Sequence, residues 1–143
     1  LKLTGFTELL KPYIIKVLSE LVDDDIPYGF SVDEIWKNTY HRYYHQEVHD
    51  HQGYELSFVI FLTDFHKDDA KFYFVNERTR LTAELWGDVS GLMPDSLPVE
   101  GKKGDIVFFP SHMLHGVSPH KSDNPRITVS GNITIKDLRE ETL

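Results

Sequence analysis

The chain has 143 residues, enough for one domain with a substantial core, and its 23 acidic and 15 basic residues give a net charge of −8. This balance excludes the basic stripe that binds a nucleic-acid backbone, and it opposes binding to an anionic membrane surface. The chain has no cysteine, which excludes disulfides and thiolate metal sites.

No secretion signal is visible in the chain, and no apolar run approaches the roughly 20 residues that span a bilayer. A chain without cysteine is compatible with a reducing cytosol, so we expect a cytoplasmic protein. No repeat, low-complexity tract or linker divides the sequence. We therefore predict one domain over residues 1–143, with a helical N-terminal part over about 1–38 and a barrel over about 39–135.

The first predicted element is a helix over about 12–23. Pro12 suits a first helical position, and apolar residues recur at helical spacing from Ile14 to Leu21. The acidic run that begins at Asp23 ends the pattern. We expect the apolar stripe to pack against a sheet rather than against a partner protein.

A short second helix is predicted a few residues later. The sequence Ser31-Val32-Asp33-Glu34 matches a capping box and is followed by Ile35 and Trp36.

Beyond residue 38, aromatic and β-branched residues dominate, which is typical of strands. Strands are predicted near 39–46, 47–52, 55–63, 70–75, 80–86, 105–109, 113–117 and 126–135. Residues 64–69 form a polar turn, and 87–103 are predicted to be a long loop or an irregular edge. Short strands after an N-terminal helical part favour a mainly β fold, a jelly roll or barrel, over βαβ units.

Three histidines are the strongest functional signal. His49 and His51 are two residues apart, so an extended backbone directs both side chains to one face, while His115 follows a later apolar strand. Imidazole ligands suit iron, copper, zinc or nickel rather than magnesium or calcium. We therefore predict that the three side chains meet around one divalent metal.

The remaining histidines have weaker claims. His45 and Glu47 share the face of His49 and form an alternative ligand and carboxylate if the register differs. His112 is three residues from His115, but exposure to solvent is the simpler expectation. His41 and His120 are expected at the surface, and His66 in a solvated turn. The alternative for the whole set is ordinary surface and core histidines.

The order and spacing of four motifs resemble the iron(II)/2-oxoglutarate-dependent oxygenases with a double-stranded β-helix, especially the small ones of phages and marine bacteria. The motifs cover about 36 to 134, most of the chain. They are His49-Asp50-His51; the strand Leu56 to Leu62; Gly104 through His115 to Pro119; and Arg126-Ile127-Thr128-Val129-Ser130-Gly131-Asn132, with Trp36-Lys37-Asn38 before the first strands.

The resemblance implies a jelly-roll enzyme that binds iron(II) through His49, His51 and His115 and hydroxylates a substrate, with 2-oxoglutarate as cosubstrate. It also implies that Arg126 holds the far carboxylate of 2-oxoglutarate, because a guanidinium meets a carboxylate bidentately. Thr128, on the same strand face, is expected to add a hydroxyl. The alternative for Arg126 is a surface ion pair. If the gene belongs to a phage, the cytoplasm in question is that of the host cell.

The second ligand position departs from the commonest pattern of this family, which has two histidines and one carboxylate. Here it is His51, so the chain also resembles cupin dioxygenases and isomerases that do not use 2-oxoglutarate, with Glu55 as a fourth ligand. Whether His51 or a carboxylate, Glu47 or Glu55, completes the site stays open, as does a non-catalytic metal-binding module.

The aromatic residues Tyr40, Tyr43, Tyr44 and Trp86 are candidates for the cavity mouth or for core packing. The sequence does not identify the substrate beyond a small-molecule cosubstrate and gives no oligomeric state. Neither nucleic acid nor a membrane is expected as a partner.

Overall fold

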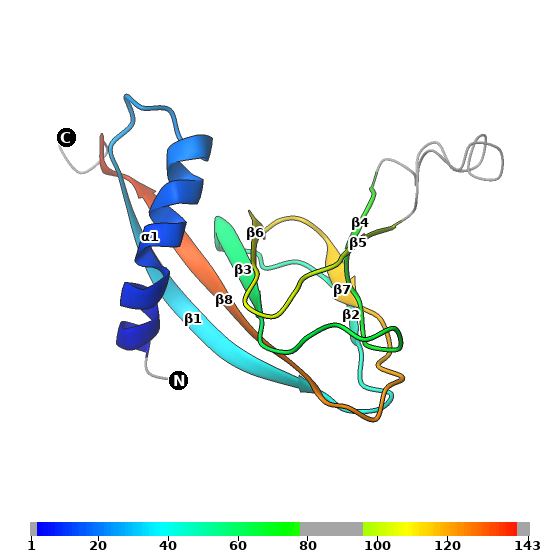
Figure 1. Cartoon of the computed structure of the whole chain (residues 1–143). Coiled ribbons are helices and arrows are strands. Elements are labelled where there is room, and N and C mark those ends of the chain that lie inside the picture. Colours follow the sequence, from blue (N-terminus) through cyan, green and yellow to red (C-terminus); the bar gives the residue numbers. More distant parts are fainter. Residues whose placement is uncertain (1–2, 78–95, 140–143) are drawn as a thin grey trace.

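The computed structural model describes residues 3–77 and 96–139. Its elements, in chain order, are α1 (Leu3–Leu21), β1 (Tyr28–Tyr40), β2 (Gln46–His49), β3 (Leu56–Phe61), β4 (Phe72–Val75), β5 (Ser96–Val99), β6 (Ile106–Pro110), β7 (His115–Val117) and β8 (Arg126–Asp137). The strands form two four-stranded antiparallel sheets that face each other, and α1 lies on the outside of one of them (Figure 1). The predicted mainly β, double-stranded β-helix fold is therefore confirmed.

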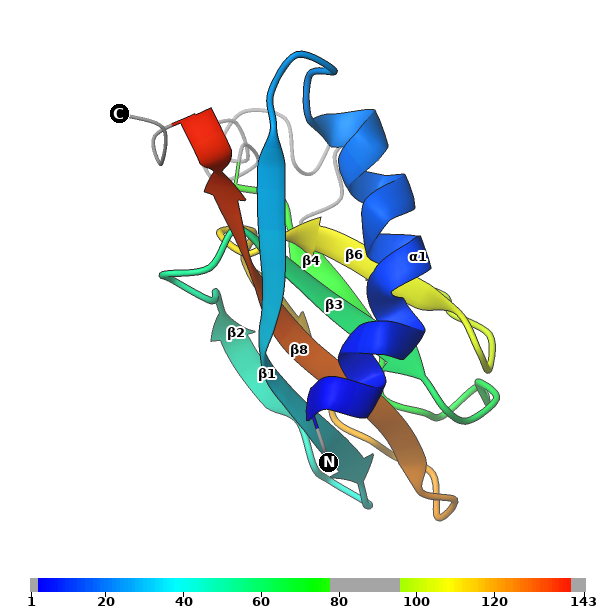
Figure 2. The same cartoon turned by 90° about the vertical axis from the view of Figure 1, so that its left-hand side faces the viewer.

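The larger sheet has the strand order β1-β8-β3-β6, and β8 is its centre. The register pairs Tyr40 with Arg126 at one end of the sheet and Ser57 with Asn132 nearer the middle. Figure 2 shows α1 lying across this sheet. Because the sheet is covered on one face by the helix and on the other by the second sheet, all six residues of β3 are buried.

Alternation along β3 separates two apolar cores. Leu56, Phe58 and Ile60 face the helix and pack with Leu10, Ile14 and Leu18 of α1. The side chains of Val59 and Phe61 face the other way and pack with Phe72 of β4 and Phe109 of β6. The first core holds the helix in place, and the second forms the interior of the barrel.

The smaller sheet has the order β2-β7-β4-β5. In its register, His49 of β2 lies opposite His115 of β7, and His115 in turn lies opposite Phe74 of β4. Two of the predicted metal ligands thus face each other across one pair of strands.

The predicted second helix at Ser31-Val32-Asp33-Glu34 is wrong. These residues belong to β1, which pairs with β8 from Tyr28 to Tyr40 and carries a bulge between Val32 and Glu34. The Ser31 hydroxyl donates to the Asp33 carboxylate at 2.8 Å instead of capping a helix. The local helix signal is outweighed here by the pairing of β1, a strand of thirteen residues, which also buries apolar side chains.

The predicted boundaries of the N-terminal part are also corrected. The first helix begins at Leu3 rather than at about 12, so Pro12 lies inside it, and it ends at Leu21. The helical part therefore ends well before residue 38, and the sheet begins at Tyr28. No helix within residues 3–77 and 96–139 is long and apolar enough to cross a membrane.

Six of the predicted strands, those near 47–52, 55–63, 70–75, 105–109, 113–117 and 126–135, correspond to β2, β3, β4, β6, β7 and β8. The strand predicted at 39–46 is wrong, because β1 ends at Tyr40 and the chain turns. The region 87–103, predicted as a long loop or an irregular edge, contains β5, which pairs with β4 at the edge of the smaller sheet. The strand predicted at 80–86 lies outside the described residues.

Candidate metal centre and cosubstrate cavity

The three predicted metal ligands converge inside the barrel. His49 ends β2, His51 follows two residues later, and His115 begins β7. One ring nitrogen from each lies within 4.8 Å of the others, and the Nε2 atoms of His51 and His115 are 3.2 Å apart. Among the described residues, no other histidine or carboxylate joins this group.

Hydrogen bonds set the ring orientation of two ligands. The Nδ1–H of His49 donates to the carbonyl of Glu47 at 2.7 Å, and the Nδ1–H of His115 donates to the carbonyl of Met113 at 2.8 Å. In the neutral form of each ring, Nε2 is therefore the nitrogen left free to bind a metal. Metal-binding histidines usually donate their second nitrogen in this way, which fixes the tautomer before the metal binds.

Burial favours the neutral forms of His51 and His115. Desolvation lowers the pKa of His115 to about 4; the hydrogen bond to Met113 acts in the opposite direction, while repulsion from His49 and His51 lowers the pKa further. The pKa of His51 is also lowered, first by burial and then by His49. Only an unprotonated imidazole binds a metal, so the site is poised for a cation at neutral pH.

Aromatic rings line the interior around the triad. The rings of Phe72, Phe74 and Phe109 lie with centroids 5.5, 6.4 and 4.8 Å from that of His115. On the other side, the ring of Trp36 lies 5.7 Å from that of His51. These rings hold the imidazoles in place and keep the surroundings of a bound ion apolar.

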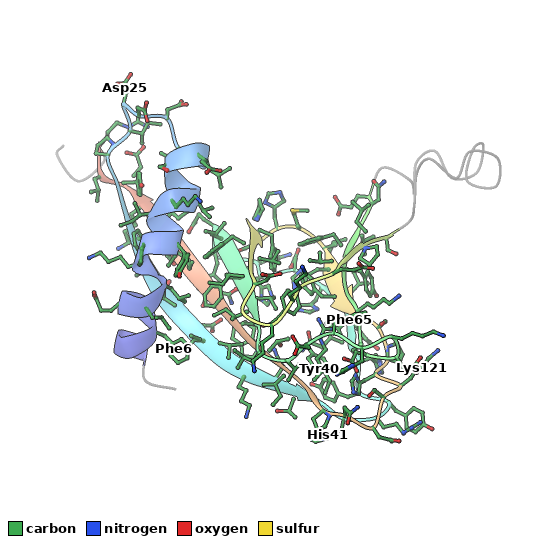
Figure 3. The ribbon with its side chains drawn as sticks, in the orientation of Figure 1. Phe6, Asp25, Tyr40, His41, Phe65 and Lys121 are labelled. Atoms are coloured by element: carbon green, nitrogen blue, oxygen red, sulfur yellow. The ribbon has the colours of Figure 1, made fainter. Side chains whose placement is uncertain are left out.

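A cavity of about 430 Å³ connects the triad to Arg126, the first residue of β8. Only 3% of Arg126 is exposed, and its Nη1 has no hydrogen-bond partner among the described residues. Its guanidinium lies 5.1 Å from the ring of Phe61 and 5.9 Å from that of Phe65. Figure 3 places Phe65 at the same end of the barrel as Tyr40.

A buried arginine in this position favours the binding of an anion. Burial lowers the pKa of Arg126, yet a guanidinium stays protonated in proteins. A buried donor without a partner is costly, and a carboxylate in the cavity removes that cost by accepting two parallel hydrogen bonds. The described structure thus fits a ligand with a carboxylate at one end and metal-binding atoms at the other.

Polar side chains line the cavity next to Arg126. Tyr40 and Thr128 both line the cavity, and burial raises the pKa of Tyr40 to about 12, so the phenol is neutral. Asn38 donates to Thr128 and Ser130. The predictions did not include Ser130, although Arg126, Thr128 and Ser130 alternate along one strand, which was a usable signal.

The alternative carboxylates lie elsewhere. The carboxylate of Glu55 is exposed and accepts a hydrogen bond from the backbone N–H of Ile135 at 2.8 Å. Glu47 is exposed at the rim of the cavity, and His45 is exposed. Neither carboxylate belongs to the ligand group found in the described part of the chain.

Among the remaining histidines, His41, His66 and His112 are exposed, as expected. The expectation that His120 lies at the surface is wrong, because its side chain is completely buried. It accepts a hydrogen bond from the N–H of Ala70 and donates to the carbonyl of Asn124, so it joins two loops.

Of the aromatic candidates for the cavity mouth or for core packing, Tyr40 lines the cavity and packs in the second core, whereas Tyr43 and Tyr44 are exposed. Trp86 lies outside the described residues.

A double-stranded β-helix with a histidine triad and a buried arginine in one cavity fits the class of metal-dependent oxygenases that use a dicarboxylate cosubstrate. A family model described as "Putative 2OG-Fe(II) oxygenase" matches residues 34–132. No curated protein matches the chain. The chain belongs to the 2OG-Fe(II) oxygenase family, an oxidoreductase family whose cofactor is iron(II) and whose cosubstrate is 2-oxoglutarate.

Solved structures share the fold. An oxidoreductase of the 2OG-Fe(II) oxygenase family from Burkholderia pseudomallei is 13% identical, with a TM-score of 0.65 over 92% of this chain and 55% of its own. HygX from Streptomyces hygroscopicus with iron bound is 14% identical, with a TM-score of 0.61 over 93% and 70%. A Pseudomonas putida prolyl-4-hydroxylase is 16% identical, with a TM-score of 0.57 over 87% and 61%. The chain thus spans only about half the length of the Burkholderia protein.

Proposed function

We propose that this chain is an iron(II)- and 2-oxoglutarate-dependent dioxygenase that hydroxylates a substrate, and that residues 1–143 form a single oxygenase domain. One observation carries the proposal: the converging imidazoles and the unpartnered Nη1 of Arg126 lie in the same cavity. HygX, which shares the fold, has also been solved with nickel and 2-oxoglutarate bound.

In this proposal, His49, His51 and His115 hold the metal through one nitrogen each and leave the rest of its coordination sphere to the cosubstrate and oxygen. Iron(II), when bound, supplies the oxygen chemistry that converts 2-oxoglutarate and dioxygen to succinate and carbon dioxide while one oxygen atom enters a substrate C–H bond. The chain itself contributes orientation, charge and exclusion of water.

Arg126 binds the far carboxylate of 2-oxoglutarate, and the hydroxyl of Thr128 donates to the same group. Both side chains are 3% exposed, so these bonds form away from water and are correspondingly strong. The cosubstrate is thereby held with its other end toward the histidines, and its position is set before the substrate arrives.

The neutral triad affects the charge balance. Three imidazoles leave a divalent metal with its full double charge, which a dianionic cosubstrate matches. The chain therefore binds 2-oxoglutarate more tightly with the metal present than without it.

The test is turnover of 2-oxoglutarate in air. Protein loaded with iron(II) without oxygen is given 2-oxoglutarate and then exposed to air, and succinate is measured. We expect slow succinate formation without added substrate, and its loss in Arg126→Ala, whereas Glu55→Ala keeps it because Glu55 lies outside the triad. If Arg126→Ala leaves metal-dependent activity unchanged, the cupin-type function replaces this one, and if no metal is retained, the enzyme assignment falls.

A further inference from the structure

A directed chain of side-chain amides crosses the floor of the cavity. The Nε2 of Gln46, on β2, donates to Oδ1 of Asn38, on β1, at 3.4 Å. The Nδ2 of Asn38 then donates to the hydroxyl oxygens of Thr128 and Ser130, on β8, at 3.3 and 3.2 Å. Three strands from both sheets therefore meet in one chain of hydrogen bonds.

The direction of this chain decides where the hydroxyl hydrogens go. An amide nitrogen only donates, so Thr128 and Ser130 act as acceptors toward Asn38 and keep their own hydrogens for other partners. Thr128 keeps its hydrogen, since its one side-chain bond within the described residues is the one it accepts from Asn38. Ser130 also keeps its hydrogen, since it has no second side-chain bond within the described residues.

The hydroxyl hydrogens of Thr128 and Ser130 are free to point into the cavity. Tyr40, Thr128 and Ser130 all line the cavity that contains the unpartnered Nη1 of Arg126. Thr128 and Ser130 present hydrogen-bond donors on the inner face of β8, and Tyr40 lies opposite Arg126 on β1. A carboxylate accepts hydrogen bonds and cannot donate, so this surface matches an anion.

We propose that Gln46 and Asn38 are positioning residues that fix the hydroxyls of Thr128 and Ser130 as donors toward the bound dicarboxylate. Neither amide touches the cosubstrate in this account. If the Asn38 amide were reversed, its oxygen would capture the hydrogens of Thr128 and Ser130, and the cavity would present oxygen lone pairs to an anion. The inference rests on the proposed function, since it takes 2-oxoglutarate as the ligand.

The Gln46→Glu variant tests the direction of the chain. A carboxylate at position 46 cannot donate to the Asn38 oxygen and instead attracts its Nδ2, which turns the amide around. Asn38→Asp has the same effect directly, because the aspartate oxygens accept hydrogen bonds from the hydroxyls of Thr128 and Ser130. If Gln46→Glu does not fold, Asn38→Asp carries the test, with retained iron binding as the check of an intact barrel.

Both variants also add a negative charge, so the design must separate charge from hydrogen-bond direction. The matched background is the double variant Thr128→Val with Ser130→Ala, in which the amide chain has no hydroxyls to direct. The dissociation constant of 2-oxoglutarate is measured by calorimetry on iron-loaded protein without oxygen. The four proteins form a double-mutant cycle in which the charge effect is common to both backgrounds and cancels.

We expect Gln46→Glu to weaken 2-oxoglutarate binding roughly 10- to 100-fold in the wild-type background. In the Thr128→Val/Ser130→Ala background, the factor by which Gln46→Glu weakens 2-oxoglutarate binding should be at least about fivefold smaller. A difference below that overturns the inference and leaves the proposed function standing. Failure of the wild-type protein to bind 2-oxoglutarate overturns the proposed function, and this inference with it.

Discussion

Replacing Arg126 with methionine removes its guanidinium from the cavity while keeping a long side chain between its aromatic neighbours. Arg126 is 3% exposed and its Nη1 has no partner within residues 3–77 and 96–139, so a bound carboxylate meets a desolvated donor. Removing one member of such a buried charge pair costs about 2–5 kcal/mol of binding free energy. The dissociation constant of 2-oxoglutarate should therefore rise by roughly 30-fold or more.

Thermal unfolding converts this loss into a simple readout. At about 100 times its dissociation constant, a ligand stabilises the native state by roughly 2.7 kcal/mol. For a chain of 143 residues this corresponds to an increase of about 6–10 °C in the melting temperature. In Arg126→Met the same concentration is at most about three times the new constant, which leaves about 0.8 kcal/mol and a shift of about 3 °C or less.

The assay compares melting temperatures with and without 2-oxoglutarate in the presence of iron(II) and the absence of oxygen. Arg42→Met is the matched control, because Arg42 is half-exposed and pairs with Asp123 at the surface. It should keep the full ligand-induced shift. An undiminished shift in Arg126→Met would show that the carboxylate binds elsewhere and would refute the reasoning.

Three further predictions concern stability and are checked by chemical denaturation. Gly131→Ala should lower the free energy of unfolding by about 1–3 kcal/mol, because an added Cβ would lie 2.4 Å from the ring of Phe58 and 2.5 Å from the carbonyl oxygen of Glu34. Gly5→Ala is the control and should not be destabilising, because the space around Gly5 is open. Ile14→Ala, at 0% exposure, should cost about 2–5 kcal/mol, whereas Ile15→Ala, at 43%, should cost far less. His120→Ala should cost about 2–4 kcal/mol, since two backbone groups lose their buried partner; costs near zero would contradict the burial described above.

The sequence predicted the convergence of the triad better than it predicted the local helices. His49 and His51 are close in sequence, and the backbone near the end of β2 is extended, so both side chains reach the interior. His115 lies 64 residues from His51, and only the motif around it, not its spacing, indicated that it would join them. The roles of these residues as ligands, and that of Arg126, stay predictions until metal and cosubstrate binding are measured.

Two of the errors share one physical cause, which is pairing between residues far apart in the chain. The segment that begins at Ser31 has the local pattern of a helix start, but its partners lie on β8, about 100 residues later. His120 looked like a surface residue because its partner at Ala70 is 50 residues away. Local propensity is weak against such long-range burial and pairing.

The hydrogen-bonded chain through Asn38 also depends on contacts between distant residues, which the local sequence does not predict. Its members come from three strands, and no spacing in the sequence predicts that Gln46 donates to Asn38 or that Asn38 donates to Ser130. What alternation does predict is that Arg126, Thr128 and Ser130 share one face. The sequence therefore identified the surface but not the direction of its hydrogen bonds.

The central claim is that one metal and one dicarboxylate bind together between the histidine triad and Arg126. An anaerobic titration tests it most directly: iron(II) is added to the protein, then 2-oxoglutarate, and the visible charge-transfer absorption of the chelate is recorded. The account predicts one iron per chain and a band that saturates at one 2-oxoglutarate per iron, both lost in His115→Ala. Full iron binding by His115→Ala, or wild-type protein that binds iron but develops no band, would contradict it.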